Sequence, residues 1–238
     1  MAKEIVVYYS PYTTVERQAL GHLIYPKPIP LQKELRLHKV QGESAWMICN
    51  AFRESFSNTF IFNHPVDVDV KFDGEKVTGK NADWVRHRPP SFENSISFDL
   101  DYGWLFFCEE DLEFISLPPI FQNNELPKYG MQSAGGFNIA RWFRPLHPTY
   151  FLWEGISEYK CFAGEPWMYF KAFTDRPVVF KPFFMTERLL EIAGMVSSHP
   201  KNNPMVPLSK RYESFKESRL RSVILKDIKE NLLEEDSL

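Results

Sequence analysis

Hydrophobic and polar residues alternate most regularly between residues 66 and 72. The apolar positions face one side of an extended chain and the charged positions face the other: Val66, Val68, Val70 and Phe72 against Asp67, Asp69 and Lys71. Asp73-Gly74 follows, a pair that favours a tight turn, and residues 75–78 continue beyond it. This pattern predicts a β-hairpin with one buried face.

Other short segments of β-branched and aromatic residues are separated by Gly and Pro. These predicted strands cover residues 4–9, 35–40, 96–100, 104–108, 113–117, 137–143, 149–153, 158–162, 167–173 and 178–183. Short strands with frequent breaks are typical of sandwiches and barrels, not of alternating strands and helices. The sequence therefore predicts a mainly β domain over residues 1–185, an antiparallel β-sandwich with jelly-roll-like spacing.

The C-terminal part has a different pattern. A short helix is predicted over residues 186–193, ended by Gly194, and residues 200–207 form a proline-rich linker. Beyond Leu208, apolar residues recur at helical spacing: Tyr212, Phe215, Val223, Ile224, Ile228 and Leu232. Residues 186–238 are thus expected to form a helical extension that packs on the β domain or on a protein partner.

Composition narrows the class of partner. Hydrophobic residues make up 44% of the 238 residues and aromatic residues 16%, so the chain can offset the entropy lost on folding. The 28 Lys and Arg residues are balanced by 31 Asp and Glu residues, for a formal net charge of −3. Without an excess of positive charge, nucleic acid is not expected as a partner.

Cysteine usage and hydropathy indicate a cellular location. Cys49, Cys108 and Cys161 are far apart in apolar or aromatic surroundings, which predicts buried free thiols and no disulfide or Cys-x-x-Cys metal site. The apolar run near the N-terminus is too short for a signal peptide, and no apolar stretch approaches the length of a membrane span. We expect a soluble, cytoplasmic protein without a membrane partner.

Two motif-like stretches fail, the first on residue type and the second on spacing. Residues 74–81 match a phosphate-binding loop through Lys80, but Asn81 stands where a Ser or Thr would bind magnesium. Residues 130–135 resemble a nucleophile elbow with one residue too many, and no helix follows. The sequence therefore indicates no catalytic residue and no cofactor.

A metal site is not encoded locally. None of the six histidines has an acid two residues later, the spacing that an iron oxygenase on a double-stranded β-helix needs. A site built from distant residues, for example His147 with Glu154 or Glu158, stays open as an alternative.

One segment combines cations, rings and a rigid turn. Arg141-Trp-Phe-Arg144-Pro145 leads into a turn that holds His147. In a strand, Arg141 and Phe143 would share one face, and Trp142 and Arg144 the other. We predict a site for a small anionic or ring-bearing ligand. Arg144 and His147 would form its polar wall, and Glu154 would supply a third polar group. Trp142 or Trp153 would form its apolar floor.

A second interpretation of the arginines stays open. Residues 86–90 form another basic segment, and the arginines of both segments can instead cap sheet edges or pair with acids in the regions of residues 99–101 and 109–110.

Several fragments together resemble DUF6065, an uncharacterised bacterial and phage family. They are residues 35–50 around Trp46, residues 142–144 with 151–153, residues 162–167, and residues 211–215 with Ser218-Arg219. The chain departs from the family pattern at residues 50–53, where the family has a glycine-rich turn. The resemblance spans roughly residues 30 to 220 but implies no reaction and no catalytic residue.

These observations favour a soluble β-rich protein that acts by binding or assembly. The alternatives are a metal-dependent enzyme on a double-stranded β-helix and a structural subunit of a phage-derived assembly.

Overall fold

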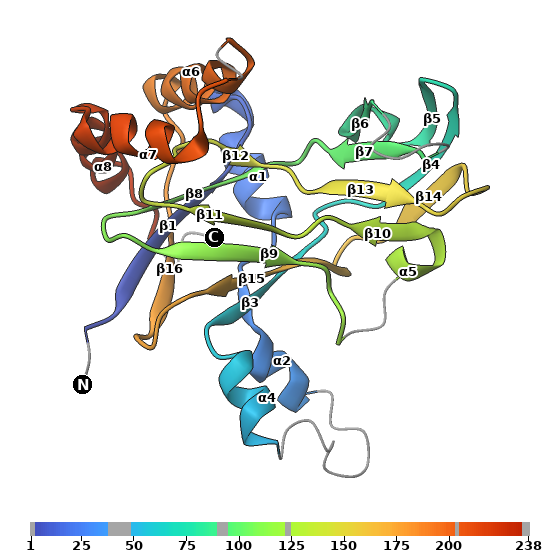
Figure 1. Cartoon of the computed structure of the whole chain (residues 1–238), viewed down its shortest axis with the longest axis horizontal. Helices are drawn as coiled ribbons and strands as arrows, with labels where there is room; N and C mark the ends of the chain where they lie inside the picture. The colour runs from blue at the N-terminus through green and yellow to red at the C-terminus, as the bar shows by residue number, and fades with distance from the viewer. Residues whose placement is uncertain (1–2, 38–48, 90–94, 122–124, 203–204, 235–238) are drawn as a thin grey trace.

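The computed structural model describes residues 3–37, 49–89, 95–121, 125–202 and 205–234. The fold is mainly β, as predicted, and most neighbouring strands are antiparallel (Figure 1). The described strands divide among four sheets, and none of these sheets closes into a barrel. The finer expectation of a jelly-roll sandwich therefore stays a prediction.

The first sheet contains the N-terminal strand. Its order is β12 (Pro145–Leu146), β8 (Trp104–Cys108), β1 (Ile5–Pro11) and β16 (Val178–Pro182). Strand β1 pairs in parallel with β16 and antiparallel with β8. The predicted strand at residues 4–9 is confirmed, although it continues past Ser10 because Pro11 still faces Trp104 in the ladder.

An aromatic sheet holds much of the core. Its order is β11 (Gly135–Asn138), β9 (Glu113–Leu117), β15 (Pro166–Ala172), β3 (Thr59–Asn63) and β2 (Ile29–Pro30). Phe170 of β15 is fully buried, and its ring meets those of Phe62 and Phe106 edge-on with centroids 4.9 Å apart in each case. Edge-to-face pairs of this kind add to the free energy gained from burial.

The two remaining sheets include the predicted hairpin. One has the order β10 (Gly130–Gln132), β13 (Thr149–Leu152), β7 (Ser97–Leu100), β6 (Val85–Arg88), and the other β14 (Glu158–Cys161), β4 (Val68–Asp73), β5 (Lys76–Lys80). Buried and exposed residues alternate along β4, and Gly74 adopts a positive φ of 58° in the turn. Strand β5 pairs antiparallel with β4, so the stretch that resembles a phosphate loop is part of a hairpin. Lys80 Nζ lies 2.7 Å from Asp67 Oδ2.

Three C-terminal helices cover the end of the first sheet. They are α6 (Glu187–Asn202), α7 (Leu208–Glu217) and α8 (Leu220–Glu230) (Figure 1). Phe215 of α7 and Ile224 and Ile228 of α8 share an apolar cluster with Phe107 and Phe143. The amphipathic helices predicted beyond Leu208 are confirmed, and their apolar side chains pack on residues of the β strands.

The predicted end of α6 at Gly194 is wrong. The helix continues to Asn202. Gly194 lacks the positive φ of a helix-ending glycine, and a glycine inside a helix costs only about 1 kcal/mol. The burial of Leu189, Ile192 and Val196 on one side of α6 outweighs this cost.

The predicted strand at residues 35–40 is also wrong where the structure describes it. Helix α2 covers Leu31–Leu37, and residues 38–40 lie outside the described residues. Leu31 and Leu35 are four residues apart and pack in one cluster with Ile61 and Tyr169, which is the spacing of a helix face. The other helical segments are η1 (Val15–Arg17), α1 (Gln18–Ile24), α4 (Asn50–Ser55), η2 (Ala82–Trp84) and α5 (Leu126–Tyr129).

Cysteine placement corrects one further expectation. Cys108 and Cys161 are buried free thiols, but Cys49 is exposed. Among the described helices, none has both the length and the apolar character needed to cross a membrane.

Candidate functional site

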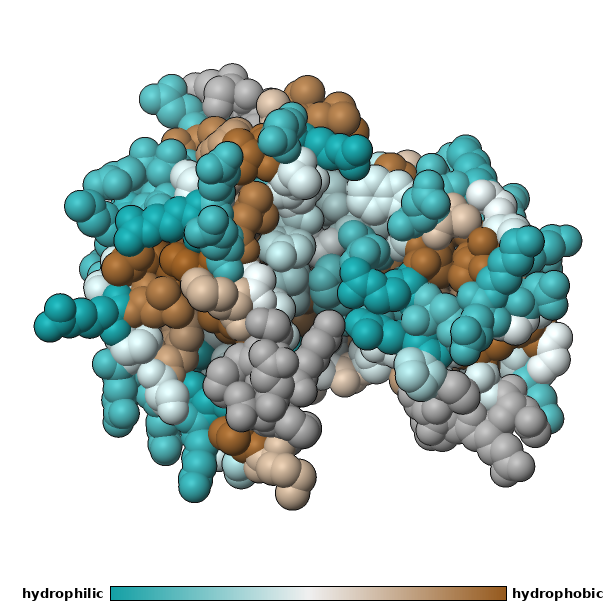
Figure 2. All heavy atoms as spheres, turned by 90° about the horizontal axis from the view of Figure 1, so that it is seen from above, coloured by the Kyte–Doolittle hydropathy of each residue, from teal (hydrophilic) through white to brown (hydrophobic). Residues whose placement is uncertain are grey.

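A cavity of about 630 Å³ lies between α6 and the strands β6 and β12. The loop after β1 contributes residues 12–14 to the lining, and strand β6 contributes Arg86 and Arg88. Residues 144–147 and helix α6 complete the lining. Seen from above, the molecule has a pale, weakly polar surface between two raised masses (Figure 2). We call this space the basic cavity.

The segment before β12 is a turn, not the predicted strand. Strand β11 ends at Asn138, and residues 139–144 leave the sheet before Pro145 pairs with Leu105. The predicted division of faces is therefore wrong, since Trp142 and Phe143 are both buried. Arg141 is engaged elsewhere, because its Nε donates to Asp111 Oδ1 at 2.8 Å.

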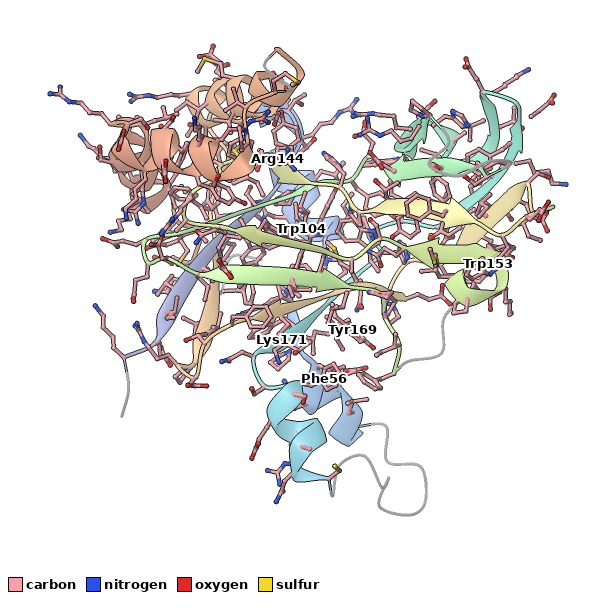
Figure 3. All side chains as sticks on the ribbon, viewed as in Figure 1. Phe56, Trp104, Arg144, Trp153, Tyr169 and Lys171 are labelled. Atoms are coloured by element: carbon pink, nitrogen blue, oxygen red, sulfur yellow. The ribbon has the colours of Figure 1, made fainter. Side chains whose placement is uncertain are left out.

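Arg144 lies on the wall of the basic cavity at the helix-covered end of the molecule (Figure 3). Its guanidinium carbon is 5.4 Å from the centre of the Trp142 ring. No hydrogen bond or ion pair joins Arg144 to any residue in the described part of the chain. Partial desolvation lowers the pKa of Arg144, but a guanidinium remains charged at neutral pH.

His147 lines the same cavity beside Asp101. The distance from its Nδ1 to Asp101 Oδ1 is 3.9 Å, too long for a hydrogen bond. Burial lowers the pKa of His147, while the Asp101 carboxylate opposes this shift. The net shift is downward, so the imidazole is mainly neutral at pH 7.

Gly103 sets the position of His147. A Cβ atom at residue 103 would lie 2.5 Å from His147 Cε1 and 3.1 Å from Pro145 Cβ. Any larger residue at 103 would therefore push the imidazole away from its place in the cavity wall.

The other two arginines of the basic cavity are paired with acids. Arg86 Nη2 donates to both carboxylate oxygens of Asp101 at 2.6 Å, and Arg88 Nε donates to Asp99 Oδ2 at 2.5 Å. Asp99 is buried and also accepts a hydrogen bond of 2.8 Å from Thr149. For these two arginines, the interpretation as ion-pair partners of nearby acids agrees with the structure.

A smaller cavity of about 170 Å³ adjoins the first one. Arg144, Leu146 and His147 line both spaces. Rings and glycines form much of the remaining wall: Phe106, Phe137, Trp142, Tyr212, Gly135 and Gly136. We call this space the ring cavity.

Two predicted site residues lie away from both cavities. Trp153 is 46% exposed, and its Nε1 donates to the Pro127 carbonyl at 3.0 Å beside α5 (Figure 3). Neither Trp153 nor Glu154 lines the basic or the ring cavity. The extended chain of β13 accounts for this, since six residues beyond His147 span roughly 20 Å.

The sequence did not indicate several residues of the cavity wall. Residues 12–14 and Ser197 come from a loop and from α6, far from Arg144 in the chain. Ser197 Oγ is buried and has no hydrogen-bond partner among the described residues. Besides Arg144 and His147, the basic segment that contains Arg86 and Arg88 is the part of the cavity wall that the sequence had singled out.

The described residues contain no group of three His, Cys, Asp or Glu side chains placed to hold a metal ion. His147 lies in the basic cavity, whereas Glu154 lies outside it and Glu158 belongs to β14. The combination of His147 with Glu154 or Glu158 therefore gains no support from this geometry.

Comparison with known proteins places no further limits on the site. The chain matches no protein-family model, no curated protein and no solved structure. The similarity to DUF6065 is neither confirmed nor refuted by these comparisons.

Proposed function

We propose that this protein binds a small anionic ligand, a carboxylate or a phosphate, in the basic cavity. Arg144 is the main contact, and His147 is a second polar group beside it. One observation carries the proposal: Arg144 is the cavity arginine that has no acidic partner among the described residues, whereas Arg86 and Arg88 are both paired.

The charge of the wall favours an anion. Three guanidinium groups face two carboxylates, those of Asp99 and Asp101, and His147 is mainly neutral. One positive charge is therefore left on the wall, and it belongs to Arg144. A guanidinium presents a planar fork of donors that matches carboxylate and phosphate oxygens.

The size and the neutral groups of the cavity also suit a small ligand. Its volume of about 630 Å³ is within the usual range for small-molecule sites. Ser197 Oγ, which has no partner in the described part of the chain, supplies a hydroxyl from helix α6, which lines the same cavity. A bound anion oxygen would accept its hydrogen bond and relieve the cost of leaving that group unpaired.

Isothermal titration calorimetry with inorganic phosphate and with acetate tests the proposal. We expect Arg144→Gln to weaken binding by at least about tenfold, because a hydrogen bond to a charged group contributes roughly 1.5–3 kcal/mol. The matched control is Arg53→Gln, which removes an exposed arginine of α4 on the far side of the sheets (Figure 1).

Equal losses in the two variants would mean that general charge, not the cavity, attracts the anion. If the wild-type protein bound neither phosphate nor acetate, the proposal would be overturned. No contact among the described residues specifically favours the metal-enzyme or phage-assembly alternative, so neither is proposed.

A further inference from the structure

The ring cavity lies next to the proposed anion site, and we infer that it holds a planar ring of the same ligand. The ligand class is then an aromatic ring that bears a carboxylate or a phosphate. This inference rests on the proposed function, because Arg144 is taken to hold the anionic group.

The volume of the ring cavity fits one six-membered ring. It measures about 170 Å³. An apolar cavity of about 150 Å³ in another protein is large enough to bind benzene. A single ring therefore fits, whereas a fused or extended system exceeds the space.

The lining of the ring cavity suits a planar, uncharged group. Phe106, Phe137 and Trp142 present ring surfaces, and Pro148 adds an apolar wall. No described residue that lines this cavity is acidic. Aromatic walls favour stacked or edge-on contacts with a bound ring.

One buried donor also lacks a partner in this wall. Trp142 is 7% exposed, and its Nε1 has no hydrogen-bond partner among the described residues. The nearby Tyr212 hydroxyl accepts a hydrogen bond from the Asn138 backbone N–H at 3.2 Å, so its own proton is available to a ligand. A ring with an acceptor substituent would satisfy donors of this kind at one end of the cavity.

Arg144, Leu146 and His147 connect the two cavities, because all three line both. An anionic group held by the Arg144 fork would therefore lie at the boundary between them. A ring attached directly to that group reaches the ring cavity without a long linker.

Water is the competing occupant. A cavity of this size with polar groups in its wall can hold ordered water that bonds to Trp142 Nε1. The two occupants differ in one measurable way, since only a ring subsite makes an aromatic anion bind more tightly than the same anion without its ring.

Calorimetric titration of the full chain with two pairs of probes tests this difference. The pairs are phenyl phosphate against inorganic phosphate, and benzoate against acetate. We expect the aromatic member of at least one pair to bind at least tenfold more tightly, and the pair that responds identifies the anionic group.

Two variants locate the ring. Gly135→Leu should reduce the preference for the aromatic probe, because a Cβ atom at this position meets only Ser116 Oγ, at 3.7 Å, and Ser116 lines the ring cavity. Trp142→Phe should also reduce it, whereas Trp153→Phe, the exposed control outside both cavities, should leave it unchanged. Circular dichroism checks that each variant folds.

Each outcome has a distinct meaning. Equal affinity for the aromatic and simple anions would overturn the ring subsite and leave the anion site intact. A preference that survives both Gly135→Leu and Trp142→Phe in folded protein would place the ring elsewhere and overturn the inference. Failure of both phosphate and acetate to bind the wild-type protein would overturn the proposed function itself, and the inference with it.

Discussion

The guanidinium of Arg144 lies over the indole of Trp142, with 5.4 Å between the guanidinium carbon and the ring centre. A cation–π contact of this kind contributes roughly 0.5–1 kcal/mol at an exposed site. In the described structure the guanidinium of Arg144 contacts the Trp142 ring and no acid. The charge and the N–H donors of Arg144 therefore remain available to a ligand. This relationship makes Arg144 different from Arg86 and Arg88, which are paired with acids.

The shape of the guanidinium should matter as well as its charge. In Arg144→Lys the positive charge stays, but the planar fork and the stacking on Trp142 are weakened. We expect phosphate affinity to fall several-fold, by less than in Arg144→Gln. Calorimetry on both variants checks the order, and a lysine variant that binds as tightly as the wild type would show that charge alone acts.

Gly103 offers a test of the position of His147. In Gly103→Ala the new Cβ would lie 2.5 Å from His147 Cε1, so the imidazole must move. We expect weaker phosphate binding and a free energy of unfolding lowered by about 1–3 kcal/mol, the usual cost of overpacking. Calorimetry and urea denaturation measure the two effects.

Gly194→Ala is the matched control for the stability effect alone, because Gly194 itself lines the basic cavity. Nothing lies within 4 Å of a Cβ at residue 194, and the residue is inside helix α6. This substitution should raise the free energy of unfolding by about 0.5–1 kcal/mol. If Gly103→Ala were equally harmless, the contact with His147 would not constrain the cavity wall.

His64 should make stability depend on pH. It is buried, its Nδ1 lies 2.5 Å from the Tyr102 hydroxyl, and burial lowers its pKa from 6.5 to about 3. Between these values the unfolded chain binds a proton that the folded protein does not. The stabilising contribution is therefore complete above pH 6.5 and is lost as the pH falls toward 3, by about 1.4 kcal/mol for each pH unit.

Urea denaturation of the wild type and of His64→Gln between pH 6.5 and pH 4.5 measures this contribution. The variant cannot titrate at this position, so its free energy of unfolding should change less steeply with pH. Parallel curves for the two proteins would show that His64 does not carry the effect.

Phe170 tests the aromatic core. Its side chain is fully buried in β15 between the rings of Phe62 and Phe106. Phe170→Ala should lower the free energy of unfolding by about 3–5 kcal/mol, the range for a buried phenylalanine. Phe173, which is 51% exposed, is the control, and Phe173→Ala should cost much less. Similar melting temperatures for the two variants would contradict a core position for Phe170.

Sequence patterns predicted the elements that depend on local signals. The β4–β5 hairpin follows directly from the period-2 alternation of β4 and its turn residues, and strand β8 follows from its run of apolar and aromatic residues. Helix α2 was missed because Leu31 and Leu35 pack on Ile61 and Tyr169, contacts that lie far away in the chain. The continuation of α6 past Gly194 likewise depends on tertiary burial of its apolar side.

The candidate site shows the same division. Arg144 and His147 are close in sequence, and the structure brings both to one cavity. Trp153 and Glu154 are nearly as close in sequence, but the extended strand β13 carries them away. Ser197 and residues 12–14 reach the cavity only through the packing of α6 and of the loop after β1, which no local pattern encodes.

The most direct test of anion binding is a crystal of the protein soaked in sodium tungstate, an analogue of phosphate with strong anomalous scattering. We predict an anomalous peak in the basic cavity, within hydrogen-bonding distance of the Arg144 guanidinium and lost in Arg144→Gln. A map whose peaks lie only elsewhere, for example beside Lys3 and Arg176 on the surface, would contradict it.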